Sequence, residues 1–370
     1  MKNILLTSTA LVAFAGAAFA DSNGVSFAGS ATLGYNEDSD DGALGDNDGF
    51  YWDANVAVTM SQELDNGLTA TVVFDFDAAD HDTGSDLVAG GYLLSLTSDT
   101  AGLYFGDTSF AAETIWSSAG DMEADGFSEA DGEVVLRGDV MMAGVTASLS
   151  YAVEDKNGVP ASDSVNQLSL GASGTFGNFT VGAAYQEEAT DDFNAANGDF
   201  TNGEIFGVFA STTFSGATVT VAYADNTAAD ITSTGVKVSY PFGPVTATAY
   251  YVMEEMGPAA AVGESDEDNF GIKVAYEAGA IAVALDYQDD QTVSKTAIDG
   301  SYDLGNGLTV FAGMYMEDGI EDEFYVAGSY DLGNGASILV AYADAPNDTD
   351  DEVGANEYQR GTTIEVGFTF

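Results

Sequence analysis

The stretch Tyr358-Gln-Arg-Gly-Thr-Thr-Ile-Glu-Val-Gly-Phe-Thr-Phe370 alternates between two kinds of side chain. One parity holds Phe, Val, Ile and Thr together with Tyr358 and Arg360, and the other holds Thr, Gly, Glu and Gln. Because successive side chains of a strand point to opposite faces, one face would be apolar with aromatic residues at both ends. A strand of about ten residues with this pattern is typical of a transmembrane β-barrel, which has lipid outside and water inside.

The other end of the sequence has the pattern of a secretory signal peptide. A short basic start, Met1-Lys-Asn3, precedes a mostly apolar stretch, and Ala18-Phe-Ala20 is a small-x-small cleavage site. We therefore expect residues 1–20 to be removed on export and residues 21–370 to form a single barrel domain. No later run approaches the roughly 18 apolar residues of a membrane-spanning helix.

The charge balance of the chain is extreme, with 61 acidic and 7 basic residues and a formal net charge of −54. Such a surface repels nucleic acid and anionic lipid headgroups, so we expect no nucleic-acid partner. A saline habitat or solvated loops would account for many of these carboxylates equally well. The absence of cysteine excludes a small disulfide-stapled secreted fold.

Alternating segments joined by tight turns continue along most of the sequence. Asn-Gly pairs, as in the repeated Tyr-Asp-Leu-Gly-Asn-Gly at 302–307 and 330–335, are typical of hairpin turns. About five strands before one long interruption and about fifteen after it make roughly twenty, with 16 and 18 as alternatives, since an even number is expected. The predicted fold is an all-β, antiparallel up-and-down transmembrane barrel of 16–20 strands. A barrel of that size leaves an aqueous channel.

The interruption at residues 108–132 is the candidate constriction loop. It contains large apolar residues that a fully solvated loop does not need: Phe110, Ile115, Trp116, Met122 and Phe127. Folded into the barrel, these would dock on the wall and leave carboxylates facing the channel. The candidate constriction acids are Asp107, at the start of the loop, and Glu113, Asp121, Glu123, Asp125, Glu129 and Asp131.

The chain resembles the general porins of alphaproteobacteria, the Rhodobacter type. The resemblance rests on Phe-Gly-Asp107 leading into the long acidic segment, on Ser329-Tyr-Asp-Leu-Gly-Asn-Gly-Ala-Ser-Ile338, and on the strand that ends at Phe370. It implies an outer-membrane homotrimer in lipid and lipopolysaccharide that passes small hydrophilic solutes. It also implies a third loop that folds inward to narrow the pore, and it implies 16 strands.

The distribution of basic residues departs from that family, whose constriction sets acidic loop residues against a basic cluster on early strands. Residues 25–107 contain no Lys or Arg, and the lumen-facing positions there hold Thr32, Asp53, Asn55 and Asp75. By parity the lumen-facing basic residues are Arg137, Lys237, Lys273 and Lys295. They either partner the acidic loop or simply offset like charge. Arg360 falls on the lipid-facing parity, so we expect it near the outer rim or in a local bulge.

We expect a porin, a channel for passive diffusion of small hydrophilic solutes and ions, that prefers cations. Screening over a Debye length of about 8 Å should weaken this preference as salt rises. One alternative is a substrate-specific channel to which inward Tyr92 or Tyr250 contributes, and another is a closed structural or adhesin barrel. An enzyme is not expected, because His81, the single histidine, lies in an Asp-rich loop without a nucleophile beside it.

No cofactor is required by this interpretation, although calcium is possible in the acidic loops. Asp38, Asp40, Asp46 and Asp48 supply the hard oxygen ligands that calcium uses. Their spacing does not match an EF-hand loop, and solvated acidic loops explain them as well. Loose divalent bridging to lipopolysaccharide is a further interpretation of the same residues.

Overall fold

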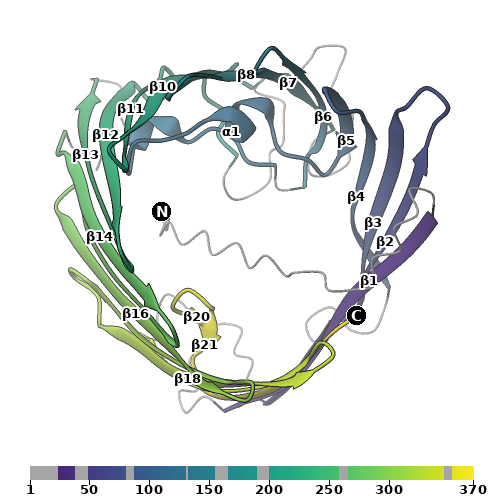
Figure 1. Cartoon of the computed structure of the whole chain (residues 1–370), viewed down its shortest axis with the longest axis vertical. Coiled ribbons are helices and arrows are strands. Elements are labelled where there is room, and N and C mark those ends of the chain that lie inside the picture. Colours follow the sequence, from purple (N-terminus) through teal and green to yellow (C-terminus); the bar gives the residue numbers. More distant parts are fainter. Residues whose placement is uncertain are drawn as a thin grey trace.

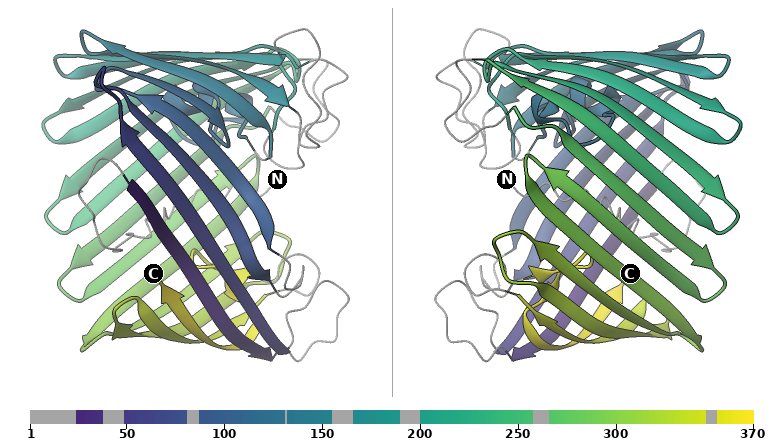
Figure 2. Two further views of the ribbon diagram at one scale, coloured as in Figure 1. Left: turned by 90° about the vertical axis from the view of Figure 1, so that its right-hand side faces the viewer. Right: turned by 90° about the vertical axis from the view of Figure 1, so that its left-hand side faces the viewer.

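The protein forms a closed antiparallel β-barrel (Figures 1 and 2). The computed structural model describes residues 24–37, 49–80, 87–130, 132–154, 166–189, 200–257, 266–345 and 352–370. Within these residues one sheet contains 20 strands, and each strand pairs with its two neighbours around the ring. The predicted fold class and the count of about twenty strands are confirmed, and the number exceeds the 16 that the family resemblance implied. In the described ranges no helix is long and apolar enough to cross a membrane.

The wall strands follow one another in sequence order, with one small additional hairpin before the last of them. The elements are β1 (Gly24–Glu37), β2 (Gly49–Glu63), β3 (Thr69–Asp80), β4 (Val88–Thr97), β5 (Ala101–Gly106), α1 (Ala111–Ile115), η1 (Glu123–Asp125), β6 (Val134–Met142), β7 (Val145–Glu154), β8 (Asn166–Phe176), β9 (Phe179–Gln186), β10 (Ile205–Phe214), β11 (Ala217–Asn226), β12 (Ile231–Phe242), β13 (Val245–Met256), β14 (Asn269–Ala278), β15 (Ile281–Asp290), β16 (Val293–Gly305), β17 (Leu308–Glu317), β18 (Glu323–Gly333), β19 (Ala336–Asp344), β20 (Glu352–Val353), β21 (Tyr358–Gln359) and β22 (Gly361–Thr369).

The first and last wall strands close the barrel. β1 pairs with β2 on one side and with β22 on the other, in register with Leu33 opposite Val366. Gly29 and Phe370 exchange backbone hydrogen bonds of 2.8 and 3.3 Å at the end of this seam. The seam matters because an unpaired strand edge in hydrocarbon would leave a row of unsatisfied N–H and C=O groups.

Side chains alternate between an apolar outer face and a more polar inner face, as the sequence predicts. Leu33, Trp52 and Ile364 stand on the outer face with 54%, 41% and 52% of their surface exposed. Tight turns join the strands at one rim. Most connections at the other rim are longer, although Gln291 and Thr292 alone join β15 to β16. The expected Asn-Gly turns are present, and Asn306 and Gly307 adopt the positive φ values of 56° and 86° that such turns require.

The alternation breaks before β22, and here the prediction for Tyr358 and Arg360 is wrong in part. Gly361 has φ of 93°, which ends the strand pattern and turns the preceding residues away from the lipid face. Tyr358 lies inside the barrel on β21, 5% exposed and 4.8 Å from the ring of Tyr325. Arg360 is 6% exposed, and its carbonyl accepts a hydrogen bond from the Asn36 amide. Arg360 directly precedes β22, beside the ends of β1 and β19, so it lies at the rim of the barrel.

We predict that barrel stability depends on the turn glycine that abuts the closing strand. Gly335 has φ of 80°, and a Cβ added there would lie 2.3 Å from the backbone oxygen of Thr369 on β22. Gly279 has φ of 60° in a comparable turn but nothing within 4 Å of such a Cβ. Gly279→Ala should cost about 1–2 kcal/mol from the left-handed backbone alone, and Gly335→Ala clearly more. Urea unfolding in lipid vesicles, followed by tryptophan fluorescence, measures both, and equal losses would contradict the closing role of this turn.

Candidate pore constriction

The loop between β5 and β6 lies inside the barrel (Figure 1). It is the third connection at the rim of the long loops, so the predicted inward fold of the third loop is confirmed. Its short helix α1 packs against β7, β8 and β9, and η1 packs against β10, β11 and β12. The loop therefore crosses the inner face of one half of the wall, and below we call residues 108–132 the inward loop.

Polar side chains on the wall accept hydrogen bonds from the backbone of the inward loop. The amides of Ala111 and Ala112 donate to the hydroxyls of Ser150 and Ser169, both at 2.8 Å. Three further contacts continue this pattern along the wall: Ser128 N to Gln186 Oε1 at 2.7 Å, Ala124 N to Ser233 Oγ at 2.9 Å, and Glu123 N to Glu254 Oε1 at 3.2 Å. In a fourth contact the direction is reversed, because the side-chain amide of Asn269 donates to the Asp121 carbonyl at 3.1 Å. These wall residues are almost completely buried, so the backbone of the loop replaces water as their partner.

Small residues on the wall make room for the large side chains of the inward loop. A Cβ added at Gly207 on β10 would lie 2.4 Å from the ring of Trp116. At Gly171 on β8 it would lie 2.6 Å from Ile115, and at Gly235 on β12 it would lie 2.9 Å from the carbonyl oxygen of Ala119. The three glycines therefore allow the loop to lie directly against the strands.

The apolar residues of the loop dock on the wall as their number in the sequence suggests. Phe110, Met122 and Phe127 are 1%, 5% and 5% exposed. Trp116 packs its ring 5.4 Å from Phe127 and 5.9 Å from Phe209 of β10. Burial of such side chains contributes about 1.5–3 kcal/mol each, enough to hold a loop of this length in place.

Arg137 on β6 fixes the first turn of the inward loop. Its guanidinium donates to the Ser109 carbonyl at 2.8 Å and to the Thr114 hydroxyl at 3.1 Å. It lies 4.7 Å from the ring centroid of Tyr104 and 3.3 Å from Asp139. Arg137 thus partners the loop backbone as well as a wall carboxylate.

The candidate acids of the inward loop occupy different environments. Burial raises the pKa of Asp121 to about 6, and repulsion by Asp290 adds to the shift. Burial also raises the pKa of Asp125 to about 7, although the Trp116 indole N–H donates to its carboxylate at 2.8 Å and Lys237 attracts it. Glu123 and Glu113 are half-buried, Glu129 and Asp107 are exposed, and Asp131 lies outside the described residues.

The candidate lysines lie on the wall strands β12, β14 and β16, near the part of the inward loop around Asp121 and Asp125. Lys273 on β14 pairs with Asp286 of β15 at 3.2 Å, and Lys295 on β16 pairs with Asp290 at 2.6 Å. Lys237 on β12 is half-buried near Asp125. The structure therefore brings these cations close to acids of the wall and of the loop tip.

The early wall carries no basic residue to face the inward loop. Thr32 lies opposite Asp53 across β1 and β2, and the Asn55 amide donates to the Asp53 carboxylate at 2.7 Å. Asp75 is exposed on β3 opposite Ala57. All are on the face opposite the lipid-exposed residues of these strands.

One aromatic expectation is wrong. Tyr92 pairs with Phe74 and packs 6.0 Å from Phe105, on the same face as the exposed Leu94. It therefore faces outward, because the β3–β4 register shifts at a bulge between Phe74 and Phe76. Tyr250 does face inward and donates to Gln288 at 3.4 Å.

Several functional residues were not identified from the sequence. The polar residues that hold the inward loop, such as Ser150, Ser169 and Gln186, have the same types as residues that face water, so no local signal distinguishes them. His81 and the possible calcium ligands Asp38, Asp40, Asp46 and Asp48 lie outside the described residues, as do residues 1–20.

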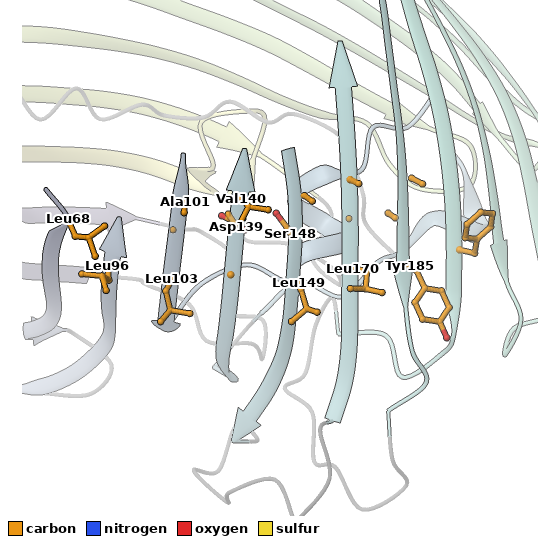
Figure 3. A pocket seen from close by; sticks show the side chains of 18 residues that line it. Leu68, Leu96, Ala101, Leu103, Asp139, Val140, Ser148, Leu149, Leu170 and Tyr185 are labelled. Atoms are coloured by element: carbon orange, nitrogen blue, oxygen red, sulfur yellow. The ribbon is translucent and has the colours of Figure 1, made fainter. Parts of the chain in front are cut away.

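One hollow lies on the outer face of the described barrel (Figure 3). It has a volume of about 790 Å³ and is formed mainly by small and apolar residues between β5 and β10. Leu103, Leu149 and Leu170 line it, and they are 48%, 46% and 37% exposed. Because it faces away from the barrel interior, it is no part of a solute path.

We predict that the inward loop can be locked to the wall without changing the channel. A Cβ at position 235 would lie 3.1 Å from the Cβ of Ala119 and 2.9 Å from its carbonyl oxygen, so a small shift of the loop away from β12 relieves this contact and brings the two Cβ atoms to the ~3.5–4.5 Å of disulfides. Ala119→Cys/Gly235→Cys, in a chain with no other cysteine, should cross-link on oxidation and show the same single-channel conductance with and without reductant. Ala119→Cys/Gly367→Cys, with the second cysteine on the inner face of β22, should not cross-link. Failure of the first pair to cross-link would contradict the position of the loop.

Comparisons with known proteins agree with this architecture. The family model described as Gram-negative porin matches residues 7–351. The porin of Rhodobacter capsulatus is 25% identical over 293 residues, which are 74% of this chain and 90% of that protein. Two mutants of the Rhodobacter blastica porin, a double and a triple mutant, superpose with TM-scores of 0.50 at 19% and 20% identity, and each match covers 75% of this chain and 98% of the porin. The chain belongs to the Gram-negative porin family, and it is a channel-forming, multi-pass β-barrel of the bacterial outer membrane.

Proposed function

We propose that the channel is a water-filled pore for passive diffusion of small hydrophilic solutes and ions, and that it prefers cations. The observation that carries this proposal is the acidic inward loop held against one half of the wall, while the wall facing it from β1 to β5 has no basic residue. Three of the four candidate cations are already paired with carboxylates of the wall. The potential in the pore is therefore negative.

The strength of the preference depends on the protonation of the loop acids. A carboxylate carries its charge above its pKa and loses it as the pH falls through that value. Asp121 and Asp125, with pKa values raised to about 6 and about 7, contribute little charge at pH 5 and most of it at pH 8. Partly protonated acids at neutral pH also reduce the repulsion among the carboxylates gathered at the loop tip.

We further propose that three copies assemble in lipid and lipopolysaccharide, as the family resemblance implies. β5 has 6 residues, which span ~20 Å along the strand and less across the membrane because barrel strands tilt. A lipid-facing wall needs an apolar band of ~25 Å, so contact with a second copy would suit this region better than lipid. Detection of an SDS-resistant trimer would test this assembly.

Neither an enzymatic activity nor a cofactor is part of the proposal. The described residues contain no group of three or more His, Cys, Asp or Glu side chains arranged to hold a metal ion. The acidic residues at 38–48 lie outside the described residues, so their calcium role stays a prediction from the sequence. Calcium titration of the purified protein, followed by thermal unfolding, would test it.

We predict that cation selectivity increases with pH and that two loop acids cause the increase. The reversal potential in a planar bilayer under a potassium chloride gradient should indicate stronger potassium preference at pH 8 than at pH 5. In Asp121→Asn/Asp125→Asn this difference should largely disappear. Asp303→Asn/Asp331→Asn, which removes two carboxylates that cap turns at the other rim, is the matched control and should keep the difference. Anion preference of the wild type at low salt would contradict the proposed function.

A further inference from the structure

A second element folds into the barrel, on the part of the wall formed by the later strands (Figure 1). Hairpin β20–β21 follows β19 and lies inside the ring near β18. Its residue Ala355, with residues of β14 to β17, encloses a cavity of about 80 Å³. The lining residues are Lys273, Ala284, Asp286, Gln288, Lys295, Ala297, Asp299, Tyr315 and Ala355.

The hairpin packs tightly against the wall, so it forms a fixed side of this cavity. Val353 and Tyr358 are 1% and 5% exposed, and they belong to an apolar cluster with Tyr325 and small residues of β18 and β19. The Tyr325 hydroxyl donates to Asp299 at 2.7 Å and so ties this cluster to the cavity wall. A Cβ added at Gly313 would lie 2.3 Å from the Tyr325 ring, so this glycine provides the space for the ring.

The charge of the cavity lining differs from that of the rest of the chain. Two of the 7 basic residues of the chain, Lys273 and Lys295, line this small volume together with two carboxylates, Asp286 and Asp299. The formal charges of the lining residues therefore balance, in a protein whose net charge is −54, and the Asp290 carboxylate that pairs with Lys295 at 2.6 Å is outside this lining. A balanced pair of each sign is what a ligand with both charges requires.

The two ammonium groups keep hydrogen-bonding capacity for a ligand. An ammonium has three N–H donors, and Lys273 and Lys295 each have one carboxylate partner, Asp286 and Asp290, among the described contacts. The Lys273 side chain is 37% exposed, so it can reach a solute in the pore. The carboxylates of Asp286 and Asp299 each use one oxygen in their described contacts and keep the other as an acceptor.

We propose that this cavity is a binding subsite for small zwitterionic solutes on the permeation path. The carboxylate of the solute meets Lys273 and Lys295, and its ammonium meets Asp286 and Asp299. The subsite rests on the proposed function, since a solute reaches it only through an open pore. Its volume suits a molecule of the size of glycine, about five non-hydrogen atoms.

The lining favours a zwitterion over a simple ion. A free cation finds many carboxylates elsewhere in the pore, and the two lysines of the cavity repel it. A free anion is repelled by the acidic pore before it reaches the lysines. A zwitterion has no net charge, so it crosses the acidic pore without repulsion and satisfies both signs of charge in the cavity.

The test compares the uptake of glycine with that of its uncharged isomer glycolamide. Vesicles containing the protein are given each compound, isotope-labelled, at submillimolar concentration, and initial rates are measured. In the wild type, glycine should enter faster than glycolamide, and excess unlabelled glycine should compete with its uptake. In Lys273→Gln/Lys295→Gln the ratio of the two rates should fall by about threefold, the size expected for an exposed ion pair. Ala355→Leu, which fills the cavity without changing charge, should lower the ratio similarly.

Lys237→Gln is the matched control, because it removes one lumenal lysine from outside the cavity. If the ratio of glycine to glycolamide uptake falls equally in this variant, the electrostatic field of the whole pore explains the glycine preference. That result would overturn the subsite. An unchanged ratio in both cavity variants, or glycine uptake that unlabelled glycine does not reduce, would overturn it as well. Potassium chloride conductance of each variant verifies folding and insertion. A wild type without any conductance would instead contradict the proposed pore.

Discussion

The structure depends on one constraint, which is that every backbone N–H and C=O group inside a membrane needs a partner within the protein. A sheet meets this constraint only when its first and last strands pair, and here β1 pairs with both β2 and β22. Closure in turn divides the side chains of every strand between lipid and lumen. The alternation of apolar and polar residues along each strand follows from that division.

The same constraint acts a second time inside the barrel. The backbone of the inward loop lies against a wall of strands whose own backbone groups are already paired, so its amides need side-chain partners. Ser150, Ser169, Ser233 and Gln186 provide them, and each of these is completely buried. The loop is consequently part of the folded wall, and the acids at its tip have fixed positions in the pore.

The charged residues around this loop are arranged differently from what the family resemblance implies. The cations lie on β6, β12, β14 and β16, not on the early strands, and three of the four, Arg137, Lys273 and Lys295, pair with nearby carboxylates. Arg137 has a structural task at the base of the loop, whereas Lys273 and Lys295 line a cavity under a second inner hairpin. We therefore propose a pore that combines a negative potential with one small region whose lining charges balance.

The fold could be predicted from the sequence because its signals are local. Period-two alternation predicts the strands, and Asn-Gly pairs predict the turns. Large apolar residues within a loop predict that the third loop folds inward. Features set by a change of register were missed: Tyr92 faces outward after a bulge, and Tyr358 faces inward before Gly361. The wall residues that hold the loop were also missed, because a serine that faces water and a serine that accepts a loop amide look alike in sequence.

The most direct test of the account is the single-channel conductance of the wild type and of a variant in which a short Gly-Ser linker replaces residues 110–127. The account predicts ohmic channels for both proteins and a larger conductance for the variant, because the inward loop narrows a water-filled pore. Equal conductance would contradict the constriction by this loop. A wild type that inserts correctly but carries no current would contradict the open pore itself.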